Sequence, residues 1–461
     1  VETISLENTN PVGFSIAISP TEAFYFTLYP ELEDAILWDT ICNPSVKKIF
    51  HNALFDLSAM DEYDIDTTNI EDTMLMAMLL GVPASLAELA KLVKMEVHPM
   101  SELLKSGQTT LDISVNELAF KCCQDSKATF ALYHLLLNQI NYEYYKIEVS
   151  LIPILMKMSM RGIKLDQDKR AEFEVKFQDD TEYYRQLCID AEIANPGSPQ
   201  QVGFIMAKRG NMLPLRRRYS SIRDKWEMKI YARGEDLEKL DDPLASAVIA
   251  YRQAKKMLST YIMPLKDHIR AYTRWHLDAI TGRISSTHRN LQNIPPSIRG
   301  MFIPDNGVFT SWDANQIELR CLAYMSQDDE MIRIFEEGGD LHQATSEFMR
   351  IDKRIAKNVN FCMIYGGDVK AIMETAHIRD ASRAKELKHL WFDRYFQAGR
   401  WILEQQEQGW HDGYITTLYG RRIILPLETD SKDKIDRKSV NYPIQGSAAE
   451  IIKRVMLKCQ H

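Results

Sequence analysis

The sequence predicts an α/β protein built from several domains, and three observations support this. The chain has 461 residues, and because domains usually contain roughly 100–200 residues, about two to four of them are expected. Through residues 1–30, apolar residues mostly alternate with small or polar ones, which is typical of strands. Residues 145–195 and 244–262 instead carry the spacing of long helices. Strands first and helices later indicate an N-terminal α/β domain that ends near residue 140.

Local signals define the elements of this N-terminal part. Residues 20–22 fit a hairpin turn between two strands, and residues 46–50 predict another short strand. Helices are predicted over residues 70–80 and 117–138. A further helix is expected to begin at Ser85, which has a Glu three residues later, as in a capping box.

The middle of the chain carries two different signals. The run NPGSPQQ at residues 195–201 predicts a turn followed by the start of a helix. Residues 211–235 contain three consecutive arginines and few apolar residues, so we expect a mobile basic loop there.

The composition is that of an ordinary globular protein, with 45% hydrophobic and 26% charged residues. The formal net charge is −8, whereas small nucleic-acid-binding modules are usually basic. An acidic total does not exclude nucleic-acid binding, because the position of the positive charge decides it. No apolar run of about 18 residues is present, so no membrane contact is expected.

The cysteines indicate a reducing compartment. There are seven of them, which is an odd number, and their spacing matches no zinc-binding pattern. Cys122 and Cys123 are adjacent, which suits neither a zinc site nor an ordinary disulfide. With no signal peptide at the start of the sequence, we expect a cytoplasmic location, in a bacterial or phage-infected cell.

One candidate site lies around Asp313, in the segment FTSWDANQIELR. A β-prone run leads to this carboxylate and a helix-prone run follows it, so a strand end would hold Asp313 rigidly toward a cleft. Nucleotidyl transfer uses two divalent ions about 3.5–4 Å apart, and Mg²⁺ binds one or two carboxylates beside water and phosphate oxygens. Asp313 suits that role, and taken alone it also fits an ordinary helix N-cap.

A second candidate is the segment KRIAKNVNFCMIYGG, in which Lys353, Lys357, Phe361 and Tyr365 are each four residues apart. Four residues of a helix rise about 6 Å and turn about 40° past a full turn, so these side chains would form one slowly winding stripe about 18 Å long. Two cations followed by two aromatic rings suit a triphosphate and a stacked base. The alternative is an amphipathic helix with a solvated basic end and a buried aromatic end.

A third segment, TGRISSTHRNLQNIPP from Thr281, is dense in hydrogen-bond donors and poor in apolar residues. Such a loop suits phosphate and minor-groove contacts, although a plain surface loop has the same composition.

In a fourth segment, Arg437, Asn441 and Gln445 are four residues apart and would share one face of a helix. Pro443 requires a helix to start or kink at that point. The alternative is a solvated polar face.

Three acidic residues near the N-terminus suggest a second site. Glu2, Asp56 in HNALFD and Asp125 in KCCQDSKAT come from separate predicted elements. Together they would form a two-metal site for phosphodiester hydrolysis. Each taken singly is an ordinary surface carboxylate.

Taken together, these segments resemble DNA polymerase family A, which includes the large fragment of bacterial DNA polymerase I. SWDANQIELR is similar to the family's motif A, KRIAKNVNFCMIYGG to motif B, and TGRISSTHRNLQNIPP to the primer–template loop. NYPIQGSAAEIIKRVM resembles the segment before motif C, and IPILMKMSMRGIKLD resembles the start of the thumb. The segments follow the family's order nearly from end to end, and the size suggests a phage-like or organelle-like replication enzyme.

The resemblance implies an RNase H-like 3′–5′ exonuclease domain over residues 1–140, followed by a right-hand polymerase with palm, fingers and thumb. The thumb region is expected over 141–279, and the palm and fingers over 280–461, with the fingers at about 326–410. Motif C should begin beyond His461, so we expect the natural protein to continue and both ends of this chain to be trimmed.

The resemblance also implies residue roles. Asp313 would bind both catalytic Mg²⁺ ions, Glu318 would exclude ribonucleotides, and Lys357 would bind the triphosphate. The residues that match the nucleotide pocket are Gln316, Glu318, His342, Lys353, Lys357, Phe361 and Tyr365. The residues that match primer and template contacts are Arg283, Asn290, Gln292, Arg437, Asn441 and Gln445. Glu2, Asp56 and Asp125 would bind the exonuclease metals.

The implied reaction is template-directed DNA synthesis from dNTPs on primer-template DNA, with two Mg²⁺ ions in each of the polymerase and exonuclease sites. The primer 3′-hydroxyl would attack the α-phosphorus of the dNTP, and pyrophosphate would leave. A monomer is expected, with replication accessory proteins as further partners.

Two positions depart from the family pattern. Motif B begins with Lys353 where the family has Arg, and Lys lacks the bidentate fork of a guanidinium. The Tyr that stands four residues before the third exonuclease acid is replaced by Lys121, and the first exonuclease Asp would lie before Val1. Two alternatives follow: a protein that acts mainly as a 3′–5′ exonuclease, or a non-catalytic DNA-binding scaffold.

Overall fold

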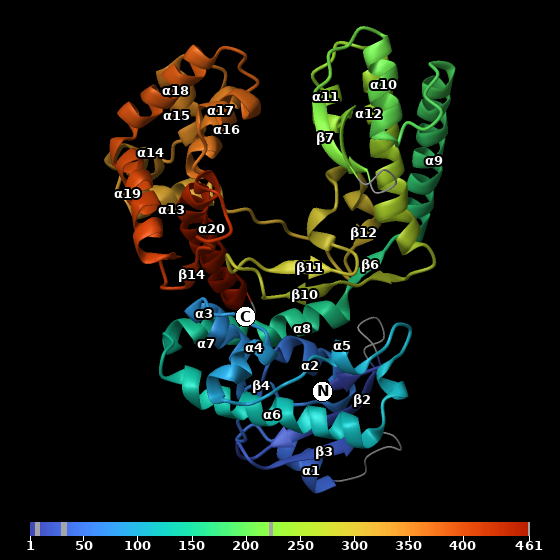
Figure 1. Ribbon diagram of the computed structural model, residues 1–461, viewed down its shortest axis with the longest axis vertical. Coiled ribbons are helices and arrows are strands. Elements are labelled where there is room, and N and C mark those ends of the chain that lie inside the picture. The colour runs from blue at the N-terminus through green and yellow to red at the C-terminus, as the bar shows by residue number, and fades with distance from the viewer. Residues whose placement is uncertain (5–9, 29–34, 221–224, 460–461) are drawn as a thin grey trace. The chain divides into compact units, whose positions relative to one another are not determined.

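The computed structural model describes residues 1–4, 10–28, 35–220 and 225–459 (Figure 1). The chain forms two compact units. The first comprises Val1–Met160, Trp275–Ser285 and Trp312–His461, and the second comprises Arg161–Arg274 and Ser286–Ser311. The chain therefore leaves the first unit and returns to it twice.

The N-terminal part of the first unit contains two small sheets. An antiparallel sheet has the order β1-β2-β3, and β4 pairs with β5 in parallel. The predicted hairpin is confirmed, because Phe14 lies opposite Phe26 with ring centroids 5.3 Å apart. The strands are β1 (Glu2–Thr3), β2 (Pro11–Ala17), β3 (Ala23–Thr27), β4 (Lys48–Phe50) and β5 (Ile70–Asp72).

Helices pack against these sheets, with the long α6 lying along β2, β3 and β4. They are α1 (Ala35–Ile41), α2 (Ala53–Ala59), α3 (Thr73–Leu80), α4 (Leu86–Ala90), α5 (Met100–Leu103), α6 (Val115–Leu137), α7 (Tyr142–Ser150) and α8 (Ile152–Arg161). The helix predicted over 117–138 is confirmed by α6. The helix predicted over 70–80 is wrong at its start, because Asp72 ends β5 and its carboxylate accepts hydrogen bonds from the first backbone amides of α3.

The second unit is built on the long pair α9 and α12, which lie side by side (Figure 1). Their core includes Cys188, Val202, Leu237 and Val248. The elements are β6 (Ile163–Leu165), α9 (Gln167–Asp190), α10 (Pro199–Lys208), β7 (Leu215–Ser220), β8 (Lys225–Ile230), α11 (Gly234–Leu237), α12 (Pro243–Lys256), β9 (Arg270–Ala271) and β12 (Phe302–Ile303). A π-helical turn, Met257–Ile262, continues α12. Strands β12, β6 and β9 form an antiparallel sheet.

The mobile basic loop predicted over 211–235 is wrong. Strands β7 and β8 form an antiparallel hairpin there, with Leu215 paired to Ile230; residues 221–224 lie outside the described residues. Ile230 packs against Gly203 of α10, where an added Cβ would lie 3.0 Å from it. Strands thus form at residues 215–220 and 225–230, where consecutive arginines suggested a loop.

The remainder of the first unit is mainly helical, around a core that includes Leu322, Trp391 and Val440. Its elements are α13 (Ile317–Ser326), α14 (Asp329–Glu336), α15 (Leu341–Met349), α16 (Lys353–Ile364), α17 (Val369–Thr375), α18 (Ala381–Arg394), α19 (Phe396–Asp412), β13 (Tyr414–Thr416), β14 (Arg422–Ile424) and α20 (Lys432–Lys458). β10 (Arg274–His276) and β11 (Ser285–Thr287) lie where the chain passes from one unit to the other.

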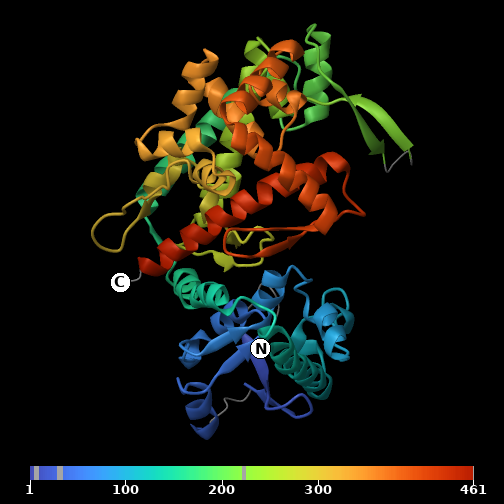
Figure 2. The same ribbon diagram turned by 90° about the vertical axis from the view of Figure 1, so that its left-hand side faces the viewer.

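Helix α20 is the longest of the described helices and is drawn in red in Figure 2, beside the β13–β14 hairpin. It runs through Pro443, so a helix does not start there. Proline removes one backbone hydrogen bond from a helix, but Val440 and Ile444 on either side are fully buried and hold this turn in place.

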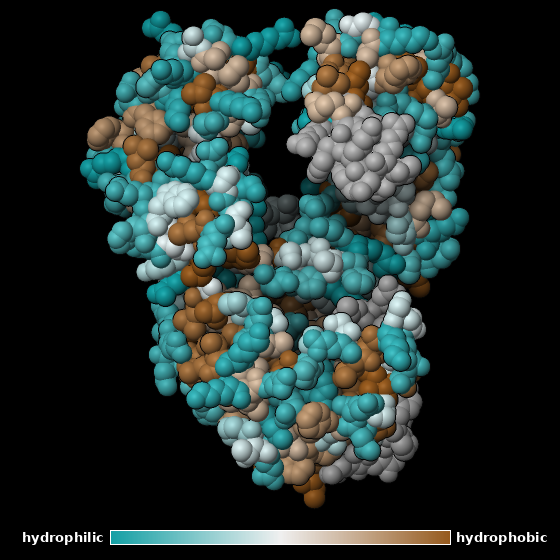
Figure 3. Space-filling view, in the orientation of Figure 1, coloured by the Kyte–Doolittle hydropathy of each residue, from teal (hydrophilic) through white to brown (hydrophobic). Residues whose placement is uncertain are grey.

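None of the helices in the described ranges is both long and apolar enough to cross a membrane. Hydrophilic side chains cover much of the face drawn in Figure 3, with separate hydrophobic patches between them.

Candidate functional site

Helix α16 carries the predicted stripe of cations and aromatic rings. Asp352 caps its first turn by accepting a hydrogen bond from the backbone amide of Arg354. Lys353 forms an ion pair with Asp340, with 2.7 Å between nitrogen and oxygen. Farther along, the exposed Lys357 ammonium lies 5.8 Å from the centre of the Phe361 ring. The stripe thus starts with two cations and continues into aromatic rings.

Glu318, in the first turn of α13, joins three segments that are distant in sequence. Arg283 forms an ion pair with one of its carboxylate oxygens, and the Tyr365 hydroxyl donates to the other over 2.9 Å. Tyr365 also stacks on Phe361, with ring centroids 5.9 Å apart. Burial and the Glu318 charge raise the pKa of Tyr365 to about 12, so it stays a hydrogen-bond donor. The structure therefore brings four of the predicted residues together.

His342 and Gln316 complete this neighbourhood. The buried His342 ring lies 5.5 Å from the Phe361 ring, and Asn360 donates to its Nδ1 over 3.0 Å. Burial lowers the pKa of His342, which favours the neutral ring at pH 7. Gln316 accepts a hydrogen bond from the backbone amide of Leu341 and so links the start of α13 to the start of α15.

Asn360 is a supporting residue that pattern reasoning missed. It is fully buried on α16, and its carbonyl oxygen accepts a hydrogen bond from Trp391 while its amide bonds His342 and Thr345. The available signal was the position of Asn360 among the apolar residues of an amphipathic helix. A buried amide needs several hydrogen-bond partners, so such a residue indicates a polar network.

Asp313 lies in an exposed segment without regular secondary structure just before α13, and the strand predicted to end there is wrong. Among the described residues no strand pairs with this segment, so Phe309 and Trp312 remain 59% and 91% exposed. A β-prone run becomes a strand only when a neighbour accepts its backbone hydrogen bonds. One exposed carboxylate without an ion pair fits a Mg²⁺ ion whose other ligands are water and phosphate oxygens.

The predicted DNA-contacting residues fall on both units. Arg437, Asn441 and Gln445 lie on α20, as the spacing of four predicted. Gly366, which follows α16 with a φ of +63°, approaches α20 so closely that a Cβ would lie 2.9 Å from the Cα of Arg437. The end of the motif helix therefore meets α20 beside Arg437.

Asn290 and Gln292 belong to the second unit, whereas Arg283 belongs to the first. The side chain of Asn290 caps a short helical turn by accepting hydrogen bonds from the Gln292 amide and the Ser286 hydroxyl. This turn is a local structure of the second unit.

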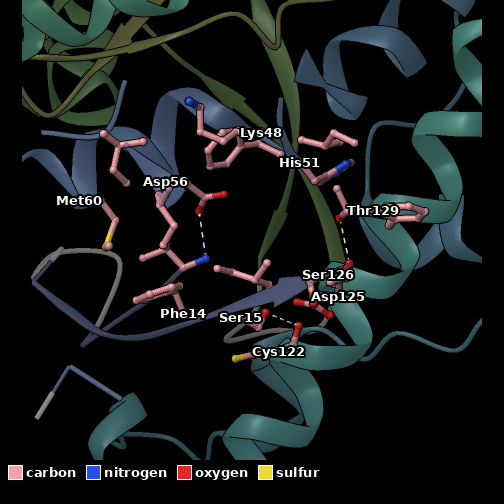
Figure 4. Close-up of a pocket in the computed structure, with 18 of the residues that line it drawn as sticks. Phe14, Ser15, Lys48, His51, Asp56, Met60, Cys122, Asp125, Ser126 and Thr129 are labelled. Carbon is pink, nitrogen blue, oxygen red and sulfur yellow. Dashed lines mark hydrogen bonds and ion pairs between the residues drawn. The ribbon is translucent and has the colours of Figure 1, made fainter. Parts of the chain in front are cut away.

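The three N-terminal acids line one pocket of about 490 Å³. Glu2 lies on β1, Asp56 on α2 and Asp125 on α6. Figure 4 shows Asp56 and Asp125 at the pocket, with the strand that carries Ser15 beside Asp125. Burial raises the pKa of Asp56 to about 6 and also raises that of Asp125. Separate elements thus bring the three predicted acids to one place.

A lysine occupies the space between two of these acids. The Lys121 ammonium lies 2.6 Å from a Glu2 oxygen and 2.7 Å from an Asp125 oxygen. Within the described residues, no group of three or more His, Cys, Asp or Glu side chains is arranged to hold a metal ion. In this arrangement the donor set does not fit the divalent ions expected for the pocket.

In the chain, an α/β part with an acid-lined pocket precedes a mainly helical part that carries the α16 stripe. Two family models match the chain. The model described as 3'-5' exonuclease matches residues 1–141, and the model described as DNA polymerase family A matches residues 167–461. The chain belongs to DNA polymerase family A.

Individual relatives agree with this assignment. The chain is 32% identical over 498 aligned residues to DNA polymerase I of Chloroflexus aurantiacus, which covers 97% of this chain and 52% of that protein. It is 37% identical over 246 residues to the thermostable DNA polymerase I of Thermus aquaticus, which covers 47% of this chain and 29% of that protein. The chain spans about half the length of the curated relatives it matches first.

A solved structure shows the same fold. It is the POL domain of Pol1 from M. smegmatis in complex with DNA primer-template and dNTP, with a TM-score of 0.78 and 24% identity. The match covers 95% of this chain and 80% of that one. The predicted fold class, an exonuclease domain followed by a family A polymerase fold, is therefore confirmed.

Proposed function

We propose that this chain is the exonuclease and polymerase part of an enzyme that extends a DNA primer on a DNA template. The observation that carries this proposal is the junction at Glu318, where Arg283, Tyr365 and the α16 stripe meet in the first unit. Cations for a triphosphate, a carboxylate for the sugar and rings for a base are the parts that a deoxynucleotide needs. The second unit would supply the thumb, and α14 to α19 the fingers.

Each residue has a physical role in this pocket. Lys357, exposed and without an ion pair among the described side chains, attracts the triphosphate. Lys353 is held by Asp340 and binds phosphate as a point charge. Tyr365 and Phe361 offer ring faces on which a base stacks, a contact of about 1–3 kcal/mol. Correct positioning and charge neutralisation provide most of the catalysis of phosphoryl transfer.

Asp313 would hold the divalent cation of the polymerase reaction through its carboxylate oxygens. Magnesium, when bound, supplies positive charge that offsets the charge on the triphosphate and on the attacking oxygen. Arg437, Asn441 and Gln445 on α20 present donors toward primer-template DNA beside the end of α16.

Primer elongation tests this proposal. The full-length protein is incubated with a 5′-labelled primer on a longer template, dNTPs and Mg²⁺, with EDTA as the control. We expect elongation that EDTA abolishes, because the pocket needs a divalent ion to accept a triphosphate. Shortening without elongation would favour the nuclease alternative, and an unchanged primer would favour the scaffold.

Replacing Glu318 with Ala should weaken the discrimination against ribonucleotides. The shorter side chain opens space beside Arg283 and Tyr365, where the sugar would lie, so the kcat/KM for an rNTP should rise relative to that for a dNTP by about tenfold or more, equivalent to about 1.4 kcal/mol. Single-nucleotide incorporation with matched dCTP and CTP measures this ratio. Glu347→Ala, which removes a carboxylate that bonds only Gln343 on α15 among the described side chains, is the control. An unchanged ratio in Glu318→Ala would contradict this role.

A further inference from the structure

Lys121 lies on α6, one helical turn before Asp125, and reaches across to β1. Its ammonium contacts both Glu2 and Asp125 at hydrogen-bond distance, and only 12% of its side chain is exposed. The backbone of α6 is fixed here as well, because the Ser15 hydroxyl of β2 donates to the carbonyl of Cys122 over 2.7 Å. The ammonium is therefore held inside the acid pocket.

The position of the ammonium nitrogen matters for metal binding. Mg²⁺ requires carboxylate oxygens at about 2.0–2.1 Å in near-octahedral geometry. A nitrogen that lies 2.6 and 2.7 Å from one oxygen of each acid stands between the two side chains that would ligate the ion. A cation of charge +1 thus already neutralises part of the charge that would attract a divalent ion.

The pocket nevertheless retains ligand capacity. The second carboxylate oxygen of Asp125 is buried and has no hydrogen-bond partner among the described residues. An unpaired buried carboxylate oxygen is costly, and a metal ion would satisfy it. The lysine and a metal would therefore compete for the same two carboxylates.

We propose that Lys121 is a resident counter-ion of the exonuclease pocket that competes with divalent cations for Glu2 and Asp125 and so limits metal binding there. This inference rests on the proposed exonuclease function. A metal that takes both carboxylates as ligands must displace the ammonium, which breaks two charge-assisted hydrogen bonds in a mostly buried site. The 3′–5′ exonuclease is consequently restrained by one side chain of its own domain.

Replacement of Lys121 with Met removes the charge and keeps a long, flexible side chain. The full-length protein carries Asp313→Ala in every sample, so that the polymerase site does not contribute a metal signal. Mn²⁺ binding is measured without DNA by electron paramagnetic resonance of the free ion. We expect Lys121→Met to bind Mn²⁺ at least about tenfold more tightly than the parent, because the competing cation is gone.

Three further variants sharpen the measurement. Lys127→Met, on the same helix and without an ion pair among the described side chains, should leave the affinity unchanged. Lys121→Arg should keep it weak, since a guanidinium retains the positive charge. Lys121→Tyr should bind Mn²⁺ as tightly as Lys121→Met. It takes the place of the Lys121→Met variant in the measurement if circular dichroism shows that Lys121→Met is unfolded. Equal or weaker Mn²⁺ affinity in folded Lys121→Met and Lys121→Tyr would overturn the proposal.

Degradation of a 3′-labelled single strand separates this inference from the function on which it rests. Faster degradation in Lys121→Tyr that Asp125→Ala abolishes would support both. Tighter Mn²⁺ binding in Lys121→Tyr, with no degradation by this variant or by the parent, would support the counter-ion role of Lys121 and contradict the exonuclease function. If Lys121→Tyr and the parent bind Mn²⁺ equally and both degrade the strand in a way that Asp125→Ala abolishes, only the counter-ion role of Lys121 is overturned.

Discussion

Replacing Asp313 with Ala should abolish primer elongation, with a fall in the single-turnover incorporation rate of about 10³-fold or more. The carboxylate is exposed and has no ion pair among the described residues, so its removal should not disturb folding. What is lost is the oxygen ligand that would position the cation beside the triphosphate and the primer hydroxyl. Rapid-quench incorporation of one matched dNTP measures the effect.

The matched control is Asp412→Ala. Asp412 is a partly exposed carboxylate at the end of α19, bonded to His411 and Gln408, away from the α16 stripe in sequence and contacts. It should leave the incorporation rate within about twofold, because surface pairs contribute little. An Asp313→Ala protein that still elongates at a comparable rate would show that the metal is held elsewhere.

Replacing Glu148 with Ala should produce the largest loss of stability, a decrease in the free energy of unfolding of about 3–5 kcal/mol. Glu148, on α7, bonds Arg421 over 2.9 Å and Lys453 over 2.6 Å, and all three side chains are at most 1% exposed. Its removal leaves the buried Lys453 without its carboxylate and leaves Arg421 with only the longer contact to Glu450, at 3.8 Å. Urea unfolding followed by circular dichroism measures the loss.

Glu143→Ala on the same helix is the control, because its pair with Lys146 is exposed and should contribute at most about 1 kcal/mol. A loss in Glu148→Ala no greater than in this control would contradict the account of the buried cluster.

The same cluster gives stability a defined pH dependence. Burial alone would raise the pKa of Glu148, but the charges of Lys453 and Arg421 outweigh it and lower the pKa from 4.5 to about 2. Because the folded-state pKa lies below the unfolded one, this contribution is fully present above about pH 4.5 and is lost as the pH falls toward 2. Glu148→Gln should flatten the stability profile in that window.

The sequence predicted those parts of the fold whose signal is local. The spacing of Lys353, Lys357, Phe361 and Tyr365 predicted α16, and alternation predicted the β2–β3 hairpin. The β7–β8 hairpin was missed although its strands are adjacent in sequence, because consecutive arginines and few apolar residues give no strand alternation there. The start of α3 at Thr73 was missed because Asp72 ends β5, whose partner β4 is distant in sequence.

In the candidate site as well, the sequence predicted individual residues but not the contacts between them. Pattern and resemblance nominated Arg283, Glu318 and Tyr365 one by one, but only the folded chain shows that they meet. The Glu148–Arg421–Lys453 cluster left no sequence signal, since each member lies in an ordinary helical or loop segment. Lys121 was recognised from the sequence as a departure from the family pattern, but its position between Glu2 and Asp125 depends on tertiary packing.

Single-nucleotide incorporation on four templates, each with a different first unpaired base beyond the primer end, tests directly whether the protein carries out templated DNA synthesis. Each template is offered the four dNTPs one at a time, with the full-length protein and Mg²⁺. We expect extension by one nucleotide with the complementary dNTP, at a rate at least about 10²-fold above that with any other dNTP. Extension that does not follow the template base, or a primer that is only shortened, would contradict it.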